Sequence, residues 1–223
     1  MLSVIVPVLN EARQLPDALG ALRPLIQAGT EILIVDGGSQ DDSVAITQAA
    51  GFRVIVAERG RARQMNAGAV LATGDVLLFL HADTRLPAHA DVTIASALAD
   101  KRSVWGRFDV RIIGRPLMLR IVSRLMNLRS RMTGIATGDQ AIFVTRAAFN
   151  TVGGFPEQPL MEDIELSSRL LAVSRPACLS ACVTTSGRRW ETNGVWRTIL
   201  LMWRLRWNYW RGVPARELAE AYR

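Results

Sequence analysis

The first hundred residues alternate between short apolar runs and longer amphipathic segments. The apolar runs are rich in β-branched residues, which is typical of strands buried on both faces of a parallel sheet. They cover residues 2–8, 31–35, 52–57 and 76–80. The amphipathic segments between them have helical spacing and cover roughly 12–28, 40–50, 61–72 and 88–99. This alternation predicts an α/β domain with a mostly parallel sheet flanked by helices on both sides.

The second half of the chain is less regular. Its apolar runs predict strands at 104–113, within 136–145 and at 178–184. Helical spacing recurs at 115–132, 162–173 and 194–211. No Pro-, Gly- or Ser-rich stretch is long enough to act as a linker. The sequence therefore predicts one domain, followed by a C-terminal helical extension.

Polar residues follow the predicted strands of the first half, where open α/β sheets bind their ligands. Asp36 ends the second strand, and the glycines Gly37 and Gly38 permit a tight turn and the close approach of a ligand. Asp36 is therefore a candidate hydrogen-bond acceptor for a base or a ribose. We expect Ser39 to be the N-cap of the next helix, with Asp42 completing a capping box.

Two other segments at this edge of the sheet carry charges. Asp83 follows the fourth strand, where a carboxylate can bind a hard divalent cation that bridges two phosphates; the alternative is a buried pair of His81 and Asp83. Arg59, Arg61 and Arg63 begin a helix, where basic residues oppose the helix dipole. A bound diphosphate would explain these arginines, and a solvated basic turn is the alternative.

Three carboxylates open the helix predicted at 162–173. The helix dipole favours acidic residues in the first turn, so stability alone can explain any one of them. Adjacent acids in a cleft can also raise the pKa of one member and create a general base. Helical spacing places Glu165 on the same face as Glu162 and points Asp163 elsewhere.

Composition adds a strong positive charge to this picture. The net charge is +7, and of 27 basic residues only Lys101 is a lysine. Arginines and apolar residues alternate along 115–132, and four tryptophans lie among arginines at 195–211. Such segments suit contact with an anionic membrane surface. The alternative is that their apolar stripes pack on the sheet while the arginines extend into water.

Location is predicted from what the sequence lacks. The N-terminus has no basic leader or cleavage site, and no apolar run reaches the ~18 residues of a membrane span. Cys178 and Cys182 lack the partners of a zinc site, so we expect reduced, buried cysteines. These features predict a cytoplasmic protein.

Six segments in this order resemble the motifs of the family 2 inverting glycosyltransferases with the GT-A fold. They are PVLNE (7–11), VDGGSxDxS (35–43), RxxQMNxGA (61–69), HAD (81–83), TGDQAIFV (137–144) and MEDIELS (161–167). More narrowly, they are similar to the bacterial subgroup found in radical-SAM and arsenosugar-type gene neighbourhoods. The resemblance implies a GT-A domain at 1–213, with a nucleotide-binding half at about 1–100, an acceptor half at about 101–190 and a helical extension at 191–223.

The resemblance also implies roles for the residues that bind the donor. Pro7 and Glu11 would lie beside the nucleotide base, and Asp36 would hold the base or the ribose. Arg61 would face the diphosphate, and Asp83 would bind Mg²⁺ or Mn²⁺. His81 replaces the first aspartate of the family's Asp-x-Asp motif. Imidazole prefers softer metals, so His81 would contact the ribose and metal dependence is less certain than in the family.

On the acceptor side, the resemblance implies that Asp163 deprotonates the acceptor hydroxyl. Asp139, Gln140 and Glu162 would line the sugar or acceptor pocket. The segment 188–190 only partly matches the Gln-x-x-Arg-Trp motif of processive members, which favours a non-processive enzyme. The predicted partners are a nucleotide sugar, most commonly UDP-linked in the family, a small-molecule or lipid hydroxyl acceptor, and an anionic membrane surface; nucleic acid is not expected.

Two other functions remain as alternatives. A nucleotidyltransferase would share the sheet and the metal-binding carboxylate, but it normally has a glycine-rich loop with a lysine after the first strand, where this chain has PVLNEAR. A non-catalytic protein on a degenerate transferase fold could bind membrane or nucleic acid through its arginines. That alternative leaves the carboxylates at the strand ends unexplained.

Overall fold

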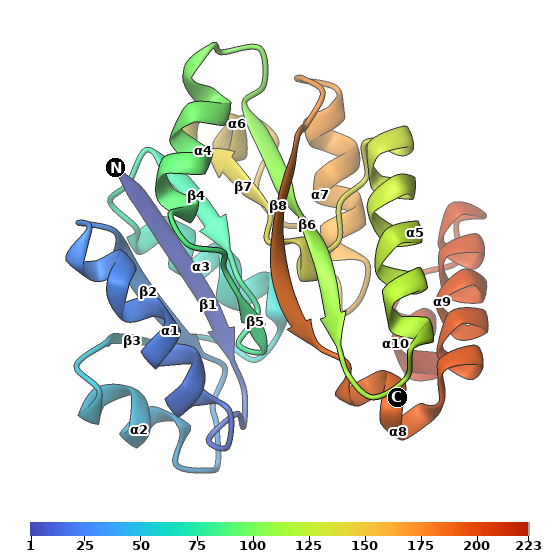
Figure 1. The fold of residues 1–223 in the computed structure, drawn as a ribbon, viewed down its shortest axis with the longest axis horizontal. Helices are drawn as coiled ribbons and strands as arrows, with labels where there is room; N and C mark the ends of the chain where they lie inside the picture. The colour runs from blue at the N-terminus through green and yellow to red at the C-terminus, as the bar shows by residue number, and fades with distance from the viewer. Residues whose placement is uncertain (223) are drawn as a thin grey trace.

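The first half of the chain forms the parallel part of a mixed sheet in the computed structural model, which describes residues 1–222 (Figure 1). Its strands are β1 (Leu2–Val8), β2 (Glu31–Asp36), β3 (Arg53–Val56) and β4 (Val76–Phe79). The helices between and after them are α1 (Leu15–Gln27), α2 (Ser43–Ala49), α3 (Arg61–Leu71) and α4 (Ala90–Ala99). All the elements predicted here from the hydrophobic pattern are confirmed, with ends that differ by a few residues.

The rest of the structure consists of four more strands, the remaining helices and a 3₁₀ turn. The strands are β5 (Thr84–Arg85), β6 (Trp105–Ile113), β7 (Phe143–Thr145) and β8 (Ala177–Ser186). The helices are α5 (Met118–Thr133), α6 (Arg146–Thr151), α7 (Glu162–Leu171), α8 (Arg188–Asn193), α9 (Val195–Trp210) and α10 (Ala215–Tyr222), and η1 (Gly138–Gln140) is a 3₁₀ turn. The short elements β5, α6 and α8 were not predicted, whereas α10 lies within the helical extension expected at 191–223.

The strand order of the sheet is β3-β2-β1-β4-β7-β6-β8-β5. β1 pairs in parallel with both β2 and β4, so the chain changes direction across the sheet between β1 and β4. β7 runs antiparallel to β4 and to β6, which makes the sheet mixed. This architecture confirms the predicted α/β class and is the GT-A fold. A change of direction of this kind places a binding crevice beyond the carboxyl ends of β1 and β4.

Two apolar cores cover the two faces of the sheet. Because successive residues of a strand point to opposite faces, Val4 and Val6 pack in a cluster with α1 and α4, whereas Ile5 packs in a cluster with α3, α6 and α7. Both cores contain fully buried side chains of β4, such as Leu77 and Leu78. The sheet is therefore a rigid support for the loops at its carboxyl edge.

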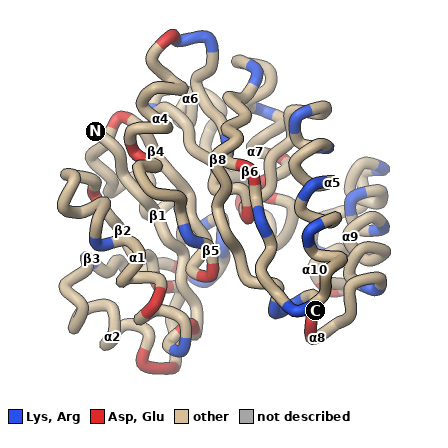
Figure 2. Tube along the Cα trace, viewed as in Figure 1, with Lys and Arg blue, Asp and Glu red and all other residues tan. Residues whose placement is uncertain are grey.

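The C-terminal helices pack against the beginning of α7. Leu205 of α9 and Leu218 of α10 form a small core with Leu160 and Met161, which directly precede α7. Arginines follow α5 and α9 along one side of the molecule (Figure 2). Within residues 1–222, no helix has both the length and the apolar composition needed to cross a bilayer.

Candidate functional site

The loops after β1 and β2 are joined by hydrogen bonds. The amide of Asn10 donates to Ser39 Oγ at 2.9 Å, and the Gln40 amide donates to Asn10 Oδ1 at 2.8 Å. The Glu11 amide donates to Ser43 Oγ at 2.9 Å. Asn10 has a φ of 55°, a left-handed conformation that asparagine tolerates better than most residues. These bonds hold the two loops as one unit beside the predicted nucleotide site.

Asp36 is buried at the end of β2, with 3% of its surface exposed. Its Oδ2 accepts hydrogen bonds from the amides of Gly38 at 2.8 Å and Ser39 at 2.9 Å. Its Oδ1 is buried without a hydrogen-bond partner among the described residues. An unsatisfied buried acceptor costs about 1–3 kcal/mol. Asp36 therefore presents an acceptor that a ligand donor could satisfy.

The predicted capping box after Asp36 is wrong. α2 begins at Ser43, with Asp42 at the N-cap position and no side-chain cap. Ser39 is not available as a cap, because its amide is bound to Asp36 and its hydroxyl oxygen accepts from Asn10. The hydrogen bonds between the two loops thus replace the local cap that the sequence suggested.

Glu11 and Asp83 approach each other beyond the ends of β1 and β4. Burial raises the pKa of Glu11, the charge of Arg188 lowers it, and the charge of Asp83 raises it further. The Glu11 carboxylate also accepts a hydrogen bond from Gln14 Nε2 at 2.7 Å. Pro7 is half-buried within β1 and pairs with Val35. The structure therefore brings Glu11 and Asp83 together and places Pro7 near the end of β1, before the loop that carries Glu11.

The residues around Asp83 offer few ligands to a divalent cation. Among residues 1–222, no group of three or more His, Cys, Asp or Glu side chains is arranged to hold a metal. Asp83 is half-buried, and its carboxylate accepts a hydrogen bond from Thr84 Oγ1 at 3.3 Å. Mg²⁺ is commonly bound by one or two carboxylates together with substrate phosphates and water. This donor set fits a cation shared with a diphosphate.

His81 lies between the end of β4 and the turn η1. Its Nδ1 is 3.3 Å from Asp139 Oδ1. The ring also packs so closely on Gly138 that a Cβ atom at this position would overlap it. Burial raises the pKa of Asp139, but the contact with His81 and the charge of Arg61 outweigh it and hold that pKa below its ordinary value. His81 therefore keeps an ionised carboxylate in the site.

Glu162 is the buried acid at the start of α7, with 3% of its surface exposed. Its Oε1 is 3.4 Å from Arg61 Nη1. Burial and the neighbouring charge of Asp163 raise the pKa of Glu162, and Arg61 opposes this rise. Met161, which precedes it, has a φ of 66°, an unusual value for a side chain of this size. Strain of this kind is common at functional sites.

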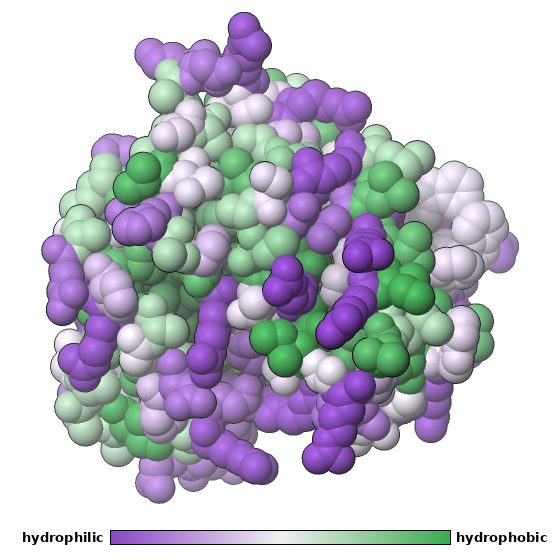
Figure 3. All heavy atoms as spheres, viewed as in Figure 1, coloured by the Kyte–Doolittle hydropathy of each residue, from purple (hydrophilic) through white to green (hydrophobic). Residues whose placement is uncertain are grey.

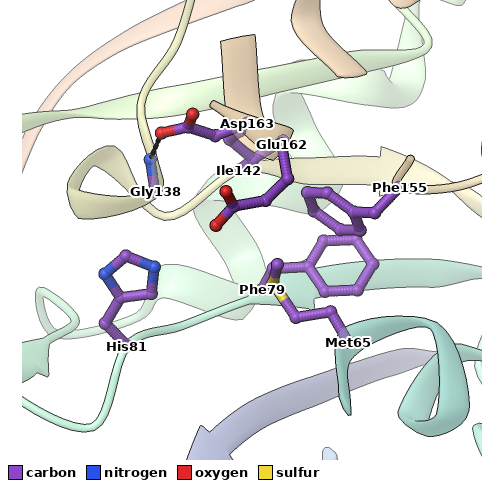
Figure 4. A pocket seen from close by; sticks show the side chains of 8 residues that line it. All are labelled: Met65, Phe79, His81, Gly138, Ile142, Phe155, Glu162 and Asp163. Carbon is purple, nitrogen blue, oxygen red and sulfur yellow. Dashed lines mark hydrogen bonds between the residues drawn. The ribbon is translucent and has the colours of Figure 1, made fainter. Parts of the chain in front are cut away.

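Asp163 is held in a fixed orientation by two backbone amides. Its Oδ2 accepts a hydrogen bond from Gly138 N at 2.8 Å, and its Oδ1 accepts one from Ile164 N at 2.8 Å. Figure 4 shows the carboxylate of Glu162 extending toward His81, whereas that of Asp163 is directed at Gly138. The pocket has a volume of about 10 Å³, and Met65, Phe79, Ile142 and Phe155 complete its walls. This is room for about one water molecule.

The predicted facing of the three acids on α7 is wrong. Glu162 and Asp163 line the same pocket. Glu165 instead accepts hydrogen bonds from Arg169 Nε at 3.0 Å and from the Tyr209 hydroxyl at 3.1 Å. Glu162 and Asp163 are the first two residues of the helix, and side chains at a helix end can reach beyond its terminus. Spacing along a continuous helix therefore did not apply to them.

The side chain of Gln140 is bound within the protein and stabilises the turn η1. Its side chain is fully buried, and its Oε1 accepts a hydrogen bond from Thr137 N at 3.2 Å in a capping box that closes η1. Its Nε2 lies 3.4 Å from Asn127 Oδ1. Gln140 thus fixes the turn that carries Gly138 and Asp139. Its role in a sugar or acceptor pocket stays a prediction.

Sequence reasoning missed several residues that shape the site. Gln64 Nε2 donates to the carbonyls of both Val8 and Val35 at 2.8 Å, so it joins the ends of β1 and β2. Asn66 exchanges two hydrogen bonds with the backbone of Phe155, which forms a wall of the pocket. Both belong to the segment RxxQMNxGA, whose polar residues inside a helix were the available signal.

The C-terminal helices also border the site. Arg189 lies over the ring of Tyr222, with its Cζ 3.5 Å from the ring centroid, and it donates to the Tyr222 carbonyl at 3.0 Å. Burial raises the pKa of Tyr222, while the charges of Arg189 and Arg61 lower it. α8 and α10 therefore reach the side of the site where Arg61 and Glu162 meet.

The sequence of the chain is similar to those of two bacterial transferases. It is 39% identical over 167 residues to a PGL/p-HBAD biosynthesis glycosyltransferase of Mycobacterium bovis, covering 70% of this chain and 63% of that protein. It is 33% identical over 150 residues to an undecaprenyl-phosphate 4-deoxy-4-formamido-L-arabinose transferase of Sodalis glossinidius, covering 61% of this chain and 45% of that protein. The chain thus spans less than two thirds of the length of these relatives.

A solved structure shares the fold. Glucosyl-3-phosphoglycerate synthase from Mycobacterium tuberculosis, in complex with Mg²⁺ and UDP, matches with a TM-score of 0.60 and 17% identity, over 83% of this chain and 70% of that one. At this identity the likeness speaks for the fold alone. The sequence model of glycosyl transferase family 2 matches residues 3–150, which include the loops after β1, β2 and β4 and the turn η1. With this match over more than half of its length, the chain belongs to glycosyl transferase family 2.

Proposed function

We propose that the protein is an inverting, non-processive glycosyltransferase that moves a sugar from a nucleoside-diphosphate sugar to the hydroxyl group of a small molecule or lipid. One observation carries the proposal: the acids Glu162 and Asp163 line one pocket together with His81, and Arg61 forms an ion pair with Glu162. An acid pair, a guanidinium and a nucleotide-type loop at one sheet edge supply a base, a diphosphate partner and a donor site.

The donor would lie over the joined loops after β1 and β2. The free Oδ1 of Asp36 would accept a hydrogen bond from the base or the ribose, with Pro7 and Glu11 beside the base. His81 would approach the ribose from the far side. A UDP-linked donor is supported by the shared fold with an enzyme solved with UDP.

Asp83 would hold a divalent cation, Mg²⁺ or Mn²⁺, together with the diphosphate. When bound, such a cation neutralises charge on the departing diphosphate. Arg61 would add a second positive charge to the same group. Its ion pair with Glu162 keeps the guanidinium beside the acids.

Asp163 would act as the general base. Its carboxylate accepts the proton of the acceptor hydroxyl while that oxygen attacks the anomeric carbon. The bond from this carbon to the diphosphate breaks on the opposite face, so the configuration inverts. The two amides that hold Asp163 would fix its carboxylate toward the acceptor. Asp139, Gln140 and Glu162 would shape the space for the sugar and the acceptor.

The proposal also covers the subgroup, the division of the chain, the acceptor and the location. The radical-SAM and arsenosugar-type subgroup rests on the motifs alone, and so do the division into halves at about 1–100 and 101–190 and the helical extension at 191–223. A lipid acceptor is supported by the relative that acts on undecaprenyl phosphate. A cytoplasmic location with contact to the inner membrane face, through 115–132 and 195–211, completes the proposal. Nucleic acid has no place in it.

The test is thermal unfolding with a panel of nucleoside diphosphates and diphospho-sugars, with and without Mn²⁺. A ligand at about 100 times its Kd adds about 2.7 kcal/mol to the free energy of unfolding. We expect one nucleotide to raise the Tm, more strongly with metal, and Asp83→Ala to remove the metal-dependent part.

Asp100→Ala is the matched control, because Asp100 is an exposed aspartate at the end of α4. It should leave the nucleotide response unchanged. If no nucleotide shifts the Tm, the donor site is wrong. Nucleotide binding without transfer to any acceptor would favour the non-catalytic alternative.

A further inference from the structure

Two neighbouring helices carry most of the large exposed apolar side chains of the molecule. Ten of them, each 49–77% exposed, lie on or directly before α5 and α9: Leu117, Ile121, Leu125, Leu128, Met132, Trp196, Leu200, Trp203, Trp207 and Trp210. Figure 3 shows apolar atoms over α5 and paler side chains over α9 beside them. Scattered apolar residues are normal on surfaces, but a contiguous patch marks an interaction site.

The same two helices carry positive charge and no negative charge. α5 contains Arg120, Arg124, Arg129 and Arg131, and α9 contains Arg197, Arg204 and Arg206; neither helix contains Asp or Glu. Figure 2 shows these basic positions along both helices. Part of each helix packs inward, through Leu119 and Val122 of α5 and Leu205 of α9. The remaining face combines exposed apolar groups with cations, which complements an anionic lipid surface.

A groove between α5 and α9 contains an unusual arginine. The groove has a volume of about 670 Å³ and is lined by Arg129, Trp203, Arg204, Arg206, Trp207 and Trp210. Nε and Nη2 of Arg129 are buried and have no hydrogen-bond partner among the described residues. Burying a cation without a partner is costly. An anion bound in the groove would give these two nitrogen atoms of Arg129 the partner that they lack.

The charges around Arg129 further favour a bound anion. Burial and the charge of Arg206 lower the pKa of Arg129 to about 10, with a smaller opposing effect of Asp163. Burial also lowers the pKa of Arg206, while the charges of Asp163 and Asp139 raise it. Neither Arg129 nor Arg206 forms an ion pair within residues 1–222. The two cations therefore share one volume, close to the acceptor side of the site.

We propose that this groove is a binding site for the phosphate group of a membrane lipid, held between Arg129 and Arg206. Guanidinium groups match phosphate oxygens with paired donors. Trp203, Trp207 and Trp210 then lie at the level of the lipid headgroups, where tryptophan is favoured. The exposed leucines and isoleucine of α5 enter the outer part of the acyl region. This lipid site is separate from the proposed transfer reaction. A lipid bound there would turn the acceptor side of the proposed transferase site toward the membrane.

The test is binding of the full chain to vesicles in the absence of donor. Vesicles of phosphatidylcholine alone are compared with vesicles that also contain phosphatidylglycerol, by flotation and by tryptophan emission. We expect binding and a blue shift with phosphatidylglycerol. Arg129→Gln and Arg206→Gln should each weaken this binding by more than about five-fold, which is the effect of one exposed basic residue near an anionic surface.

Two arginines serve as matched controls, since each variant removes one positive charge. Arg102→Gln, in the loop after α4, should leave binding unchanged. Arg124→Gln removes an exposed charge from α5 itself. Its loss should be smaller than that of Arg129→Gln and should disappear at high salt, because exposed charges are screened and buried ones much less so.

A second measurement keeps the proposal falsifiable if a variant binds poorly because it is misfolded. Without lipid, Arg129→Gln should have a Tm equal to or above that of the native chain, because a partly buried guanidinium with two unpaired nitrogen atoms is removed. Equal binding by the Arg129 and Arg102 variants would overturn the site. So would stabilisation by inorganic phosphate without vesicle binding, or concentration-dependent self-association in place of vesicle binding. Because no donor is present, each outcome is independent of the nucleotide test.

Discussion

The proposed reaction depends on the carboxylate group of Asp163. Both of its oxygens accept backbone hydrogen bonds, so its position does not depend on a flexible partner. Asp163→Asn should lower kcat by about 10²–10⁴, the usual contribution of a general base. The nucleotide-induced rise in Tm should persist, because Asp36 and Arg61 remain. Sugar transfer from the donor is the measurement.

Glu165→Gln is the control for Asp163→Asn. It changes another acid of the same helix turn that faces Arg169 and Tyr209 instead of the pocket. It should retain near-native kcat. Full activity of Asp163→Asn in a folded protein would assign the base to another group, with Glu162 the nearest candidate.

The raised pKa of Glu162 has a consequence for stability. A carboxyl whose pKa is higher in the folded protein binds more protons there than in the unfolded chain, so the free energy of unfolding falls as pH rises above the ordinary pKa of 4.5. Glu162→Gln removes this term. The Tm of the variant, compared with the native Tm, should therefore rise as pH increases from about 4.5.

An exposed glutamate provides the comparison for this pH series. Glu220→Gln, on α10, should keep a constant difference from the native Tm across the same pH range. A constant difference for Glu162→Gln as well would mean that Arg61 fully compensates the burial of Glu162.

At the scale of elements, the turn η1 positions both His81 and Asp163. Gly138 donates to Asp163 and packs against the His81 ring, where no Cβ fits. Gly138→Ala should displace His81 or the turn, destabilise the protein by about 1–3 kcal/mol and reduce kcat. Gly20→Ala in α1, where a Cβ meets open space, should instead be neutral or stabilising. Thermal unfolding and the transfer rate of both variants are the measurements; native kcat in Gly138→Ala would contradict this role.

At the scale of the whole molecule, the C-terminal helices support the start of α7. Leu218 of α10 is 3% exposed and packs with Leu160 and Met161. Leu218→Ala should cost about 2–5 kcal/mol and speed hydrogen exchange at residues 161–167, with lower transfer activity. Val70→Ala on α3, where the side chain is 80% exposed, is the control and should change neither. Unchanged exchange in Leu218→Ala would show that α7 is held without α10.

The sequence by itself determined the parallel half of the fold and the edge that carries chemistry. The strands and helices of residues 2–99 were predicted because strand and helix periods are local properties of the pattern. The positions of Asp36 at the end of β2, and of His81 and Asp83 after β4, followed from topology. The motif order also identified the family, although its finer subgroup stays a prediction. Short elements such as β5 and α6 were not predicted, because they contain too few residues to show a strand or helix period.

The tertiary structure decided which charged groups meet. The contacts of Arg61 with Glu162, and of Gly138 with Asp163, join residues 101 and 25 positions apart. The loop-to-loop bonds of Asn10 and Ser39 also overrode a plausible local cap. Arg129 has no anion beside it because the neighbouring helix α9, which lines the same groove, contains no acid. Electrostatic and hydrogen-bond energies depend on distances through space, which spacing along the chain does not encode.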